Sequence, residues 1–276
     1  MEKVIYFRFD IDTISCISDG IDPLLRLAHE LDLRFTFFVN MGKSISRREI
    51  FLRSPKRTLG NVMPKHVVKV SALSKLGVAA AVKTVLFNPD VGKRHLDVLD
   101  RILKAGHELG LHGGDNHSTW QRNADHWSSQ QIADAMDATH DFFARRFGKP
   151  VGFASPGGTG SPLVYAHLKQ LGYRYVSDSQ LSDAKPFDES CGLLHIPVNV
   201  HVDDVPVLES LTAQGLRDDE LQARALALLT ASQLATTVGH PCFEGKSALP
   251  ALTSLCRSLK ARGYEFLPYR ALAMPA

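Results

Sequence analysis

Residues 4–13 of the chain read VIYFRFDIDT, an apolar, β-branched and aromatic run that closes on two carboxylates. Such a run is typical of a strand buried on both faces in the middle of a parallel sheet. Because alternate strand residues point to the same side, Asp10 and Asp12 are expected to face one pocket. Parallel α/β folds place their active sites at this carboxyl end of the strands. An Asx turn that merely closes the strand is the alternative.

The rest of the chain alternates between strand-like and helix-like segments. Further strands are expected at 34–40, 108–111, 151–154, 173–177, 193–200, 234–239 and 264–267. Helices are expected at 23–32, 91–105, 128–147, 162–171, 218–229 and 247–262. This alternation predicts an α/β fold in which helices surround a parallel sheet, either open or closed into a barrel. No internal repeat or low-complexity linker interrupts it, so residues 1–276 are expected to form a single domain.

Composition excludes several classes of protein. The chain has 276 residues, of which 44% are hydrophobic and 22% charged, values typical of a globular protein and not of a disordered chain, collagen or a coiled coil. Its net charge of +3 is too small to indicate nucleic-acid binding. No apolar run approaches the ~20 residues of a membrane span, and no signal peptide or protein-partner motif is evident. The cysteines form no CxxC pair and are expected to be reduced thiols of a cytosolic protein: Cys16, Cys191, Cys242 and Cys256.

One segment departs from the average charge. Residues 43–104 hold fourteen lysines and arginines against four acids, and within them residues 66–87 read HVVKVSALSKLGVAAAVKTVLF. Four lysines fall within about a third of the circumference of a helical wheel, namely Lys65, Lys69, Lys75 and Lys83. A basic, apolar helix of this kind can lie on an anionic membrane surface. The alternative is an insertion that packs on the barrel and exposes a lysine stripe.

A pair of histidines follows another predicted strand. His112 and His117 bracket the sequence HGGDNH, in which two glycines allow the chain to fold both imidazoles toward one ion. Neutral imidazoles and a carboxylate are a common ligand set for a divalent metal and leave positions open for water.

Three further strand ends carry polar groups. His240 ends the strand at 234–239 and suits general acid–base catalysis near neutral pH, although a capped turn histidine would look the same. Asp178, after the strand at 173–177, is a candidate for orienting it. The loop Ser155-Pro156-Gly157-Gly158 offers backbone N–H groups for an oxyanion, or is a simple turn. Together with Asp10, Asp12 and the histidine pair, these groups predict a metal-dependent hydrolase.

The order of these motifs resembles the polysaccharide deacetylase family, also called the NodB-homology family or carbohydrate esterase family four. FRFDIDT, TFFVN, GHELGLHGGDNH, SPGG and the late strand ending in His240 occur in the family's order along most of the chain. Within the family, the chain is most similar to the bacterial branch that deformylates undecaprenyl-phosphate-linked formamido-arabinose. That likeness rests on NMG after the second strand, TWQ after GLH, the YVSD segment and HPCFEG at 240–245.

The resemblance implies a distorted (β/α) barrel of about seven parallel strands, with the basic insertion added. It implies that Asp10 is the catalytic base and that Asp12 and His112 bind the metal. The family's second metal histidine stands four residues after the first, where this chain has Asn116. Because imidazole is the better ligand, His117 is expected to take that place.

The resemblance also assigns roles at the other strand ends. Gly157 would supply the oxyanion N–H, His240 would be the catalytic acid, and Asp178 would orient it. The family's usual arginine beside the base maps to Ala154, so that partner is either missing or supplied from elsewhere in the chain.

The activity expected from the resemblance is metal-dependent removal of a formyl or acetyl group from the nitrogen of an amino sugar. Zinc is the first expectation for the divalent metal, with cobalt, nickel or manganese as alternatives. The basic insertion favours a substrate linked to a lipid phosphate and a peripheral location on the inner face of the cytoplasmic membrane. The alternatives are a C–N hydrolase of a soluble amide or cyclic imide, and a non-catalytic barrel that binds sugar or lipid, which the departures at Ala154 and Asn116 would favour.

Overall fold

The protein is built around a curled, nine-stranded β-sheet. The computed structural model describes residues 3–46, 87–232 and 234–274. The strands are β1 (Val4–Ile11), β2 (Thr36–Val39), β3 (Glu108–His112), β4 (Gly152–Ala154), β5 (Tyr175–Val176), β6 (Phe187–Asp188), β7 (Leu194–His195), β8 (Ala235–Gly239) and β9 (Glu265–Leu267).

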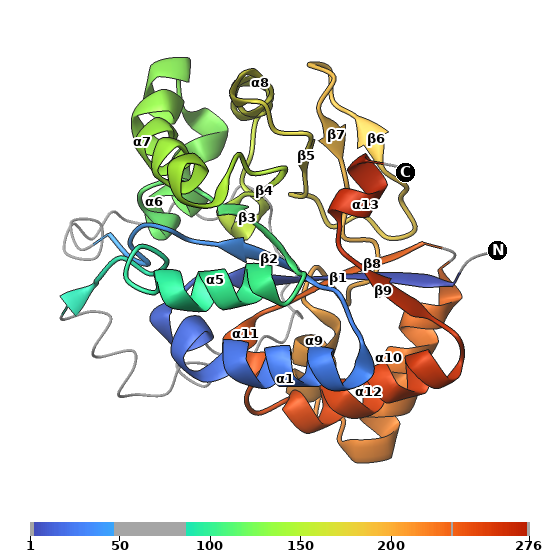
Figure 1. Cartoon of the computed structure of the whole chain (residues 1–276). Coiled ribbons are helices and arrows are strands. Elements are labelled where there is room, and N and C mark those ends of the chain that lie inside the picture. Colours follow the sequence, from blue (N-terminus) through green and yellow to red (C-terminus); the bar gives the residue numbers. More distant parts are fainter. Residues whose placement is uncertain (1–2, 47–86, 233, 275–276) are drawn as a thin grey trace.

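The strand order is β6-β7-β5-β4-β3-β2-β1-β8, and every pair except β6 with β7 is parallel. The first strand is the centre of the sheet: β2 pairs with its second half, β9 with its first half, and β8 with its other edge. Backbone N–H groups of Asn199 and Val200 both donate to the carbonyl of Thr236, at 3.1 and 3.0 Å. These bonds bring the chain after β7 round to β8, so the sheet curls into a half-barrel (Figure 1).

Helices cover the outside of this sheet. In Figure 1, α1, α10 and α12 lie along one side, while α7 and α8 lie at the opposite end of the curl. The helices are α1 (Ile21–Leu31), α5 (Leu96–Lys104), α6 (His117–Asn123), α7 (Ser129–Phe147), α8 (Pro162–Leu171), α9 (Val207–Ala213), α10 (Asp218–Ala231), α11 (Pro241–Glu244), α12 (Leu249–Ala261) and α13 (Arg270–Ala273). Three short helical turns accompany them, η1 (Cys16–Gly20), η2 (Ala124–His126) and η3 (Pro156–Gly158).

The alternation of side chains along β1 separates two cores. Phe7, Phe9 and Ile11 point outward into the large apolar core between sheet and helices. Tyr6 points inward, into a smaller cluster that fills the barrel interior together with Phe38, Ala154, Tyr175, Ile196 and Tyr269. The inward positions that follow Tyr6 are Arg8 and Asp10, which are buried to 6% exposure each. The barrel interior therefore changes from aromatic to charged on the way to the carboxyl ends of the strands.

The predicted fold class is confirmed, with differences in detail. The described sheet has nine strands rather than the roughly seven that the resemblance implies. Eight of them lie where the sequence pattern predicts a strand, β9 included, and the exposed two-residue β6 is the unexpected ninth. The short helices α6, α9 and α11 were not expected, since each is too brief to show a helical repeat.

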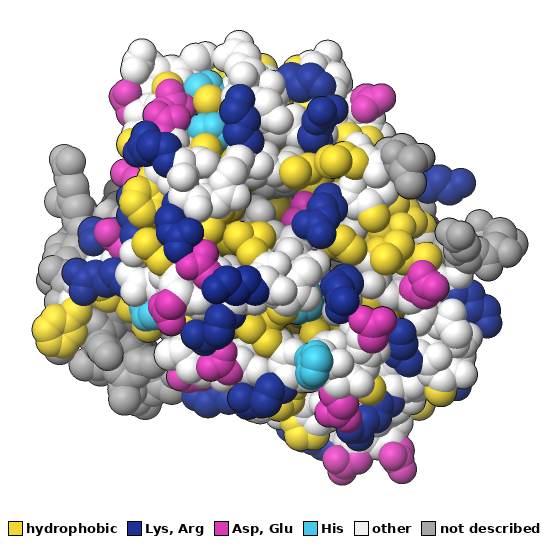
Figure 2. All heavy atoms as spheres, in the orientation of Figure 1, with side chains coloured by type: hydrophobic (Ala, Val, Ile, Leu, Met, Phe, Trp, Pro, Cys, Tyr) yellow, Lys and Arg dark blue, Asp and Glu magenta, His cyan; other side chains and the backbone are white. Residues whose placement is uncertain are grey.

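The basic insertion is described only at its ends, 43–46 and 87–104, which include α5. Lys65, Lys69, Lys75 and Lys83, and with them the expected amphipathic helix, lie outside the described residues. No helix in the described part of the chain has the length and apolarity needed to cross a bilayer. On the face drawn in Figure 2, basic and acidic side chains are intermixed rather than gathered by sign.

Candidate metal centre and active site

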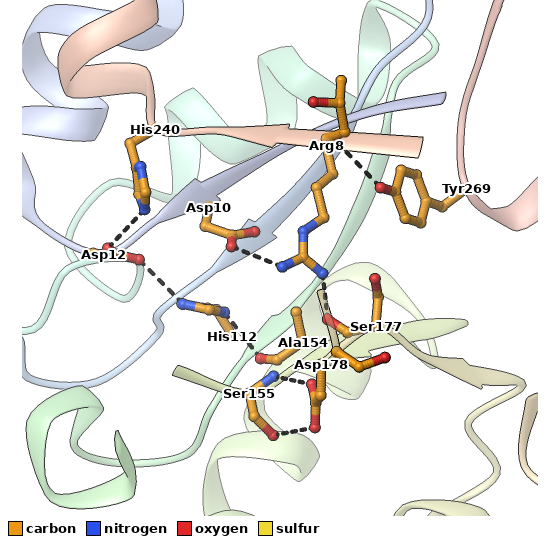
Figure 3. Close-up of polar contacts among 12 residues, drawn as sticks. Arg8, Asp10, Asp12, His112, Ala154, Ser155, Ser177, Asp178, His240 and Tyr269 are labelled. Carbon is orange, nitrogen blue, oxygen red and sulfur yellow. Dashed lines mark hydrogen bonds and ion pairs between the residues drawn. The ribbon is translucent and has the colours of Figure 1, made fainter. Parts of the chain in front are cut away.

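The candidate site lies at the carboxyl end of β1. Arg8 and Asp10 are alternate residues of β1, and Asp12 directly follows the strand. The three side chains therefore lie on the same side. Figure 3 shows Asp12 between His240 on one side and His112 on the other, with Asp10 and then Arg8 to the right of Asp12. The strand therefore places the guanidinium of Arg8 and the carboxylates of Asp10 and Asp12 in a row along its inner side.

Asp12 and two histidines form a potential metal-binding group. The Nε2 atoms of His112 and His117 lie 3.1 and 3.3 Å from Asp12 Oδ1. One ligand atom from each of the three residues lies within 4.8 Å of the others. Two imidazoles and one carboxylate that leave the rest of the coordination sphere open are typical of a catalytic zinc site.

His112 is held in the tautomer that a metal ligand needs. Its Nδ1 lies 2.9 Å from the carbonyl oxygen of Ala154, and because a carbonyl only accepts, Nδ1 is the donor. In the neutral ring, Nε2 then carries the lone pair and points at Asp12 Oδ1. Such a bond from the second ring nitrogen to a backbone carbonyl is the usual way proteins orient metal-binding histidines.

His117 lies beside Asp12, whereas Asn116 caps a helix. Asn116 is the N-cap of α6: its side-chain oxygen accepts from Thr119 N at 3.1 Å, and its side-chain nitrogen donates to the Ile45 carbonyl. His117 follows as the first residue of the helix, with its backbone N–H bonded to the carbonyl of Lys43 at 2.8 Å. The helix start thus turns His117, not its neighbour, toward Asp12.

The electrostatics of the group favour positive charge beside Asp12. Burial raises the pKa of Asp12, but the imidazoles of His117, His112 and His240 outweigh it and hold that pKa well below its ordinary value. Burial lowers the pKa of His112, yet the carboxylates of Asp10 and Asp12 outweigh burial and raise it. Asp12 therefore stays ionised and favours positive charge beside it.

Unpaired buried atoms provide a separate test of metal binding. Within the described residues, Asp12 Oδ1 and His117 Nε2 are buried, adjacent and without a hydrogen bond. Buried polar atoms are rarely left in this state, because each costs about 1–3 kcal/mol. A divalent cation between these lone pairs would satisfy both, so the donor set fits the metal that the sequence predicts.

Arg8 supplies the partner that Asp10 lacks at position 154. Its Nη2 lies 3.2 Å from Asp10 Oδ2, and its Nη1 donates to the carbonyl of Ser177 across the barrel. Ala154, which stands where the family has an arginine, is fully buried in the interior cluster. We did not expect this role for Arg8, although its position two residues before Asp10 places both on one side of β1.

Asp178 contacts the loop that begins at Ser155 rather than His240, which differs from the orienting role expected from the sequence. Its two carboxylate oxygens accept from Ser155 N and Ser155 Oγ, at 2.6 and 2.7 Å. The reason is the strand order. Asp178 follows β5 and Ser155 follows the neighbouring strand β4, whereas His240 follows β8, which lies on the other side of β1. Asp178 thus anchors the start of the SPGG loop, in which Gly157 adopts a φ of +64°. The N–H role of Gly157 stays a prediction.

The carboxylate beside His240 comes from α9. Glu209 Oε2 lies 3.5 Å from His240 Nδ1, and His240 Nε2 lies 3.6 Å from Asp12 Oδ2. The backbone of His240 is fixed separately, since its N–H donates to Glu244 Oε2 at 2.6 Å. Sequence reasoning missed Glu209 because nothing in the letters VPVLESL places it near a histidine thirty-one positions away.

Comparisons with known proteins identify similar sequences and similar folds. The family model for polysaccharide deacetylase matches residues 1–176. A curated relative from Shewanella sediminis, described as a probable 4-deoxy-4-formamido-L-arabinose-phosphoundecaprenol deformylase ArnD, is 25% identical over 264 residues, which cover 95% of this chain and 83% of that protein.

Solved structures share the fold. A crystal structure from Mycobacterium smegmatis, assigned to the polysaccharide deacetylases, superposes with a TM-score of 0.63 at 16% identity and covers 99% of this chain and 90% of its own. A Puue allantoinase superposes with a TM-score of 0.59 at 14% identity, covering 98% and 88%.

Proposed function

The chain belongs to the polysaccharide deacetylase family, and on that premise we propose that it is a metal-dependent hydrolase that removes a formyl or acetyl group from the nitrogen of an amino sugar. The observation that carries the proposal is the group of Asp12, His112 and His117 beside the buried carboxylate of Asp10. Hydrolysis of an amide needs electrophilic activation of the carbonyl, a base for water and an acid for the amine. The metal group would supply the first, Asp10 the second, and His240, which lies 3.6 Å from Asp12, the third.

Asp12, His112 and His117 would hold the metal. A divalent ion bound there supplies Lewis-acid polarisation of the acyl carbonyl and makes water more acidic. Asp10 takes the proton from the attacking water with its carboxylate, which Arg8 holds in place through Oδ2. Asp10 Oδ1, which has no hydrogen bond within the described residues, is the oxygen left to accept that proton.

The remaining residues act on the other atoms of the amide. The Gly157 N–H donates to the oxyanion as the carbonyl becomes tetrahedral, in a loop that Asp178 anchors through Ser155. His240 then gives a proton to the departing amine nitrogen. Its place on the far side of Asp12 from His112 suits a group that meets the leaving atom rather than the water (Figure 3).

For the substrate, we propose a formylated amino sugar joined to a lipid phosphate. The support is the likeness to the Shewanella sediminis protein and the excess of basic residues in 43–104. Positively charged segments gain about 1 kcal/mol per Lys or Arg near an anionic membrane surface. The proposal therefore places the enzyme in the cytoplasm, peripherally on the inner face of the membrane.

The test is a substrate panel given to the metal-loaded chain: undecaprenyl phosphate 4-formamido-arabinose, its N-acetyl counterpart, and allantoin. Release of formate or acetate from the lipid-linked sugars, absent in His112→Ala, is the expected result. Turnover of allantoin alone would replace the proposal by a soluble-amide hydrolase. Stoichiometric metal binding with no turnover of any substrate would indicate a binding protein.

The membrane part is tested separately with vesicles of anionic phospholipid. Changing Lys65, Lys69, Lys75 and Lys83 to Gln is expected to weaken sedimentation with the vesicles, and added salt should do the same. Unchanged binding in this variant would reject the role of these lysines.

A further inference from the structure

A serine, a histidine and a carboxylate are joined by hydrogen bonds near the edge of the sheet that ends in β6. Ser179 lies three residues after β5, and His195 is the last residue of the neighbouring strand β7. Glu189 directly follows β6, which pairs with β7. His195 Nε2 lies 2.8 Å from Ser179 Oγ, and His195 Nδ1 lies 2.6 Å from Glu189 Oε1. All three residues lie beyond residues 1–176, so the family match assigns them no role.

Backbone donors fix which nitrogen of this imidazole carries the proton. The N–H groups of Ser179 and Asp178 donate to His195 Nε2, at 3.1 and 3.3 Å. A nitrogen that accepts these bonds carries no proton, so in the neutral ring the proton is on Nδ1 and is donated to Glu189. The Ser179 hydroxyl is therefore a donor to Nε2. A hydroxyl that donates to an imidazole oriented by a carboxylate is the arrangement of an activated serine nucleophile.

The imidazole of His195 is enclosed by aromatic side chains. Phe187 stacks on the ring, with centroids 4.8 Å apart and an angle of 14° between the planes, and Tyr165 contacts it edge-on at 5.8 Å. His195 is only 3% exposed as a result. Because hydrogen bonds are stronger where water is excluded, this enclosure strengthens the bonds that the ring makes with Ser179 and Glu189.

The serine end of the group is less enclosed than the imidazole. Ser179 is half-buried rather than buried. Two large hydrophobic side chains beside the group are exposed: Leu181, two residues after the serine, and Phe187, which covers His195. Exposed apolar side chains around a nucleophile favour a substrate with an apolar acyl group over a charged one.

A second set of the same residue types lies close by in the sequence and is bonded differently. Ser182 Oγ lies 3.3 Å from His201 Nε2, and Asp204 Oδ1 lies 3.6 Å from His201 Nδ1. The Asp204 N–H, however, donates to that Nδ1 at 3.3 Å, so in the neutral ring the proton is on Nε2. His201 therefore donates to Ser182 and does not take its proton. This second set provides a control within the same chain.

We propose that Ser179, His195 and Glu189 form a second catalytic site, which hydrolyses carboxylic esters with an apolar acyl group. Ser179 Oγ attacks the acyl carbon while its proton moves to His195 Nε2, and Glu189 stabilises the imidazolium. The Ser179 N–H thereby loses its acceptor and turns to the oxyanion, as the nucleophile's own N–H does in serine hydrolases. The ester C–O bond then breaks, and its electron pair leaves with the alcohol oxygen, which takes the proton from Nε2. Water hydrolyses the acyl-serine by the same route and releases the acid, without use of the proposed metal ligands.

The first test is covalent labelling of the metal-loaded chain with a fluorophosphonate probe, under conditions that label a known serine esterase completely. Peptide mass spectrometry is expected to find the adduct on Ser179 and none on Ser182. His195→Gln keeps an amide oxygen that can accept from the Ser179 N–H but removes the base, so labelling should slow about 10²- to 10⁴-fold. Glu189→Gln should slow it as well, because the imidazolium loses its counter-charge. No adduct on Ser179, or an unchanged rate in His195→Gln, would overturn the proposal.

The second test is hydrolysis of p-nitrophenyl butyrate with and without a chelator, which separates this site from the proposed metal centre. Hydrolysis that persists in the chelator is expected to disappear in Ser179→Ala and after fluorophosphonate treatment, and to be kept in Ser182→Ala. Circular dichroism checks that Ser179→Ala is folded. Chelator-resistant hydrolysis that is absent from the unchanged chain, or equal in Ser179→Ala, would overturn the proposal. Neither result depends on whether the chain deacylates a sugar.

Discussion

The two ends of the barrel interior both bury charged and polar groups, but they differ in how completely these groups are hydrogen-bonded. At the amino end, Glu108 Oε2 accepts from Thr36 Oγ1 and from Arg270 N, each at 2.8 Å, and its Oε1 accepts from the Tyr175 hydroxyl at 2.9 Å. The Tyr269 N–H in turn donates to Thr36 Oγ1. This network is closed: it ties the start of α13 to β2, β3 and β5.

At the carboxyl end, several buried side-chain atoms lack a hydrogen bond. Within the described residues, Arg8 Nε, Asp10 Oδ1, Asp12 Oδ1 and His117 Nε2 are buried and have no hydrogen-bond partner. The comparison shows that burial alone does not mark a functional site, since Glu108 is as buried as Asp10. What distinguishes the carboxyl end is the set of buried polar atoms without a hydrogen bond, which a ligand would satisfy.

The largest effect is expected for His112→Ala, which removes a proposed metal ligand. Several kcal/mol of transition-state stabilisation come from a catalytic metal, so turnover should fall on the order of a thousandfold or more. Bound metal should fall below stoichiometric amounts, while the circular dichroism spectrum stays native. Full metal content in this variant would contradict the assignment of the metal group.

Next comes Asp10→Asn, which keeps the size of the side chain and removes the proposed base. We expect kcat to fall about 10²- to 10⁴-fold while the metal content is unchanged. The measurement is turnover together with elemental analysis of the same sample. Loss of the metal would show that the roles of Asp10 and Asp12 are exchanged.

The sequence predicted the carboxyl end better than the amino end, for a physical reason. Asp10, Asp12 and His112 stand at strand ends, where local pattern alone places them on the active side of the fold. The partners of Glu108 come from β2, β5 and the last helix, so only the folded chain brings them together.

The need to know the folded chain also explains why the sequence pointed to the wrong carboxylate beside His240. The sequence does not show that Glu209 rather than Asp178 faces His240, because this depends on which strands are neighbours and on a seven-residue helix whose buried face has no periodic signal. Arg8 was visible in the sequence as a charge within an apolar strand, but its pairing with Asp10 follows only once the barrel interior is known.

A change at the closed network should affect stability and spare chemistry. Glu108→Leu leaves the Thr36 hydroxyl, the Tyr175 hydroxyl and the Arg270 N–H without their acceptor. The free energy of unfolding is expected to fall by about 2–3 kcal/mol, with metal content and kcat of the folded fraction kept. Urea unfolding and turnover of the same preparation measure both. A thousandfold loss of kcat would remove the distinction between the two ends.

The smallest effect is expected at His107, next to Glu108. Burial lowers its pKa to about 4, below the ordinary value of 6.5. Because the folded chain resists protonation there, the stability due to His107 is complete above pH 6.5 and is lost as the pH falls toward 4. Between pH 7 and pH 5, the unchanged chain should lose about 1–2 kcal/mol more than His107→Gln, whose amide oxygen can still accept from the Phe35 N–H. Parallel pH profiles of the two chains would contradict this.

The most direct test of the central claim is restoration of activity by metal. The chain is stripped with a chelator and zinc is then added back in steps, while formate release from undecaprenyl phosphate 4-formamido-arabinose is followed. We predict that activity is lost on stripping and returns in proportion to zinc, reaching its plateau at one ion per chain. Undiminished turnover by the stripped chain would contradict the claim that the unsatisfied atoms at the carboxyl end are a metal centre.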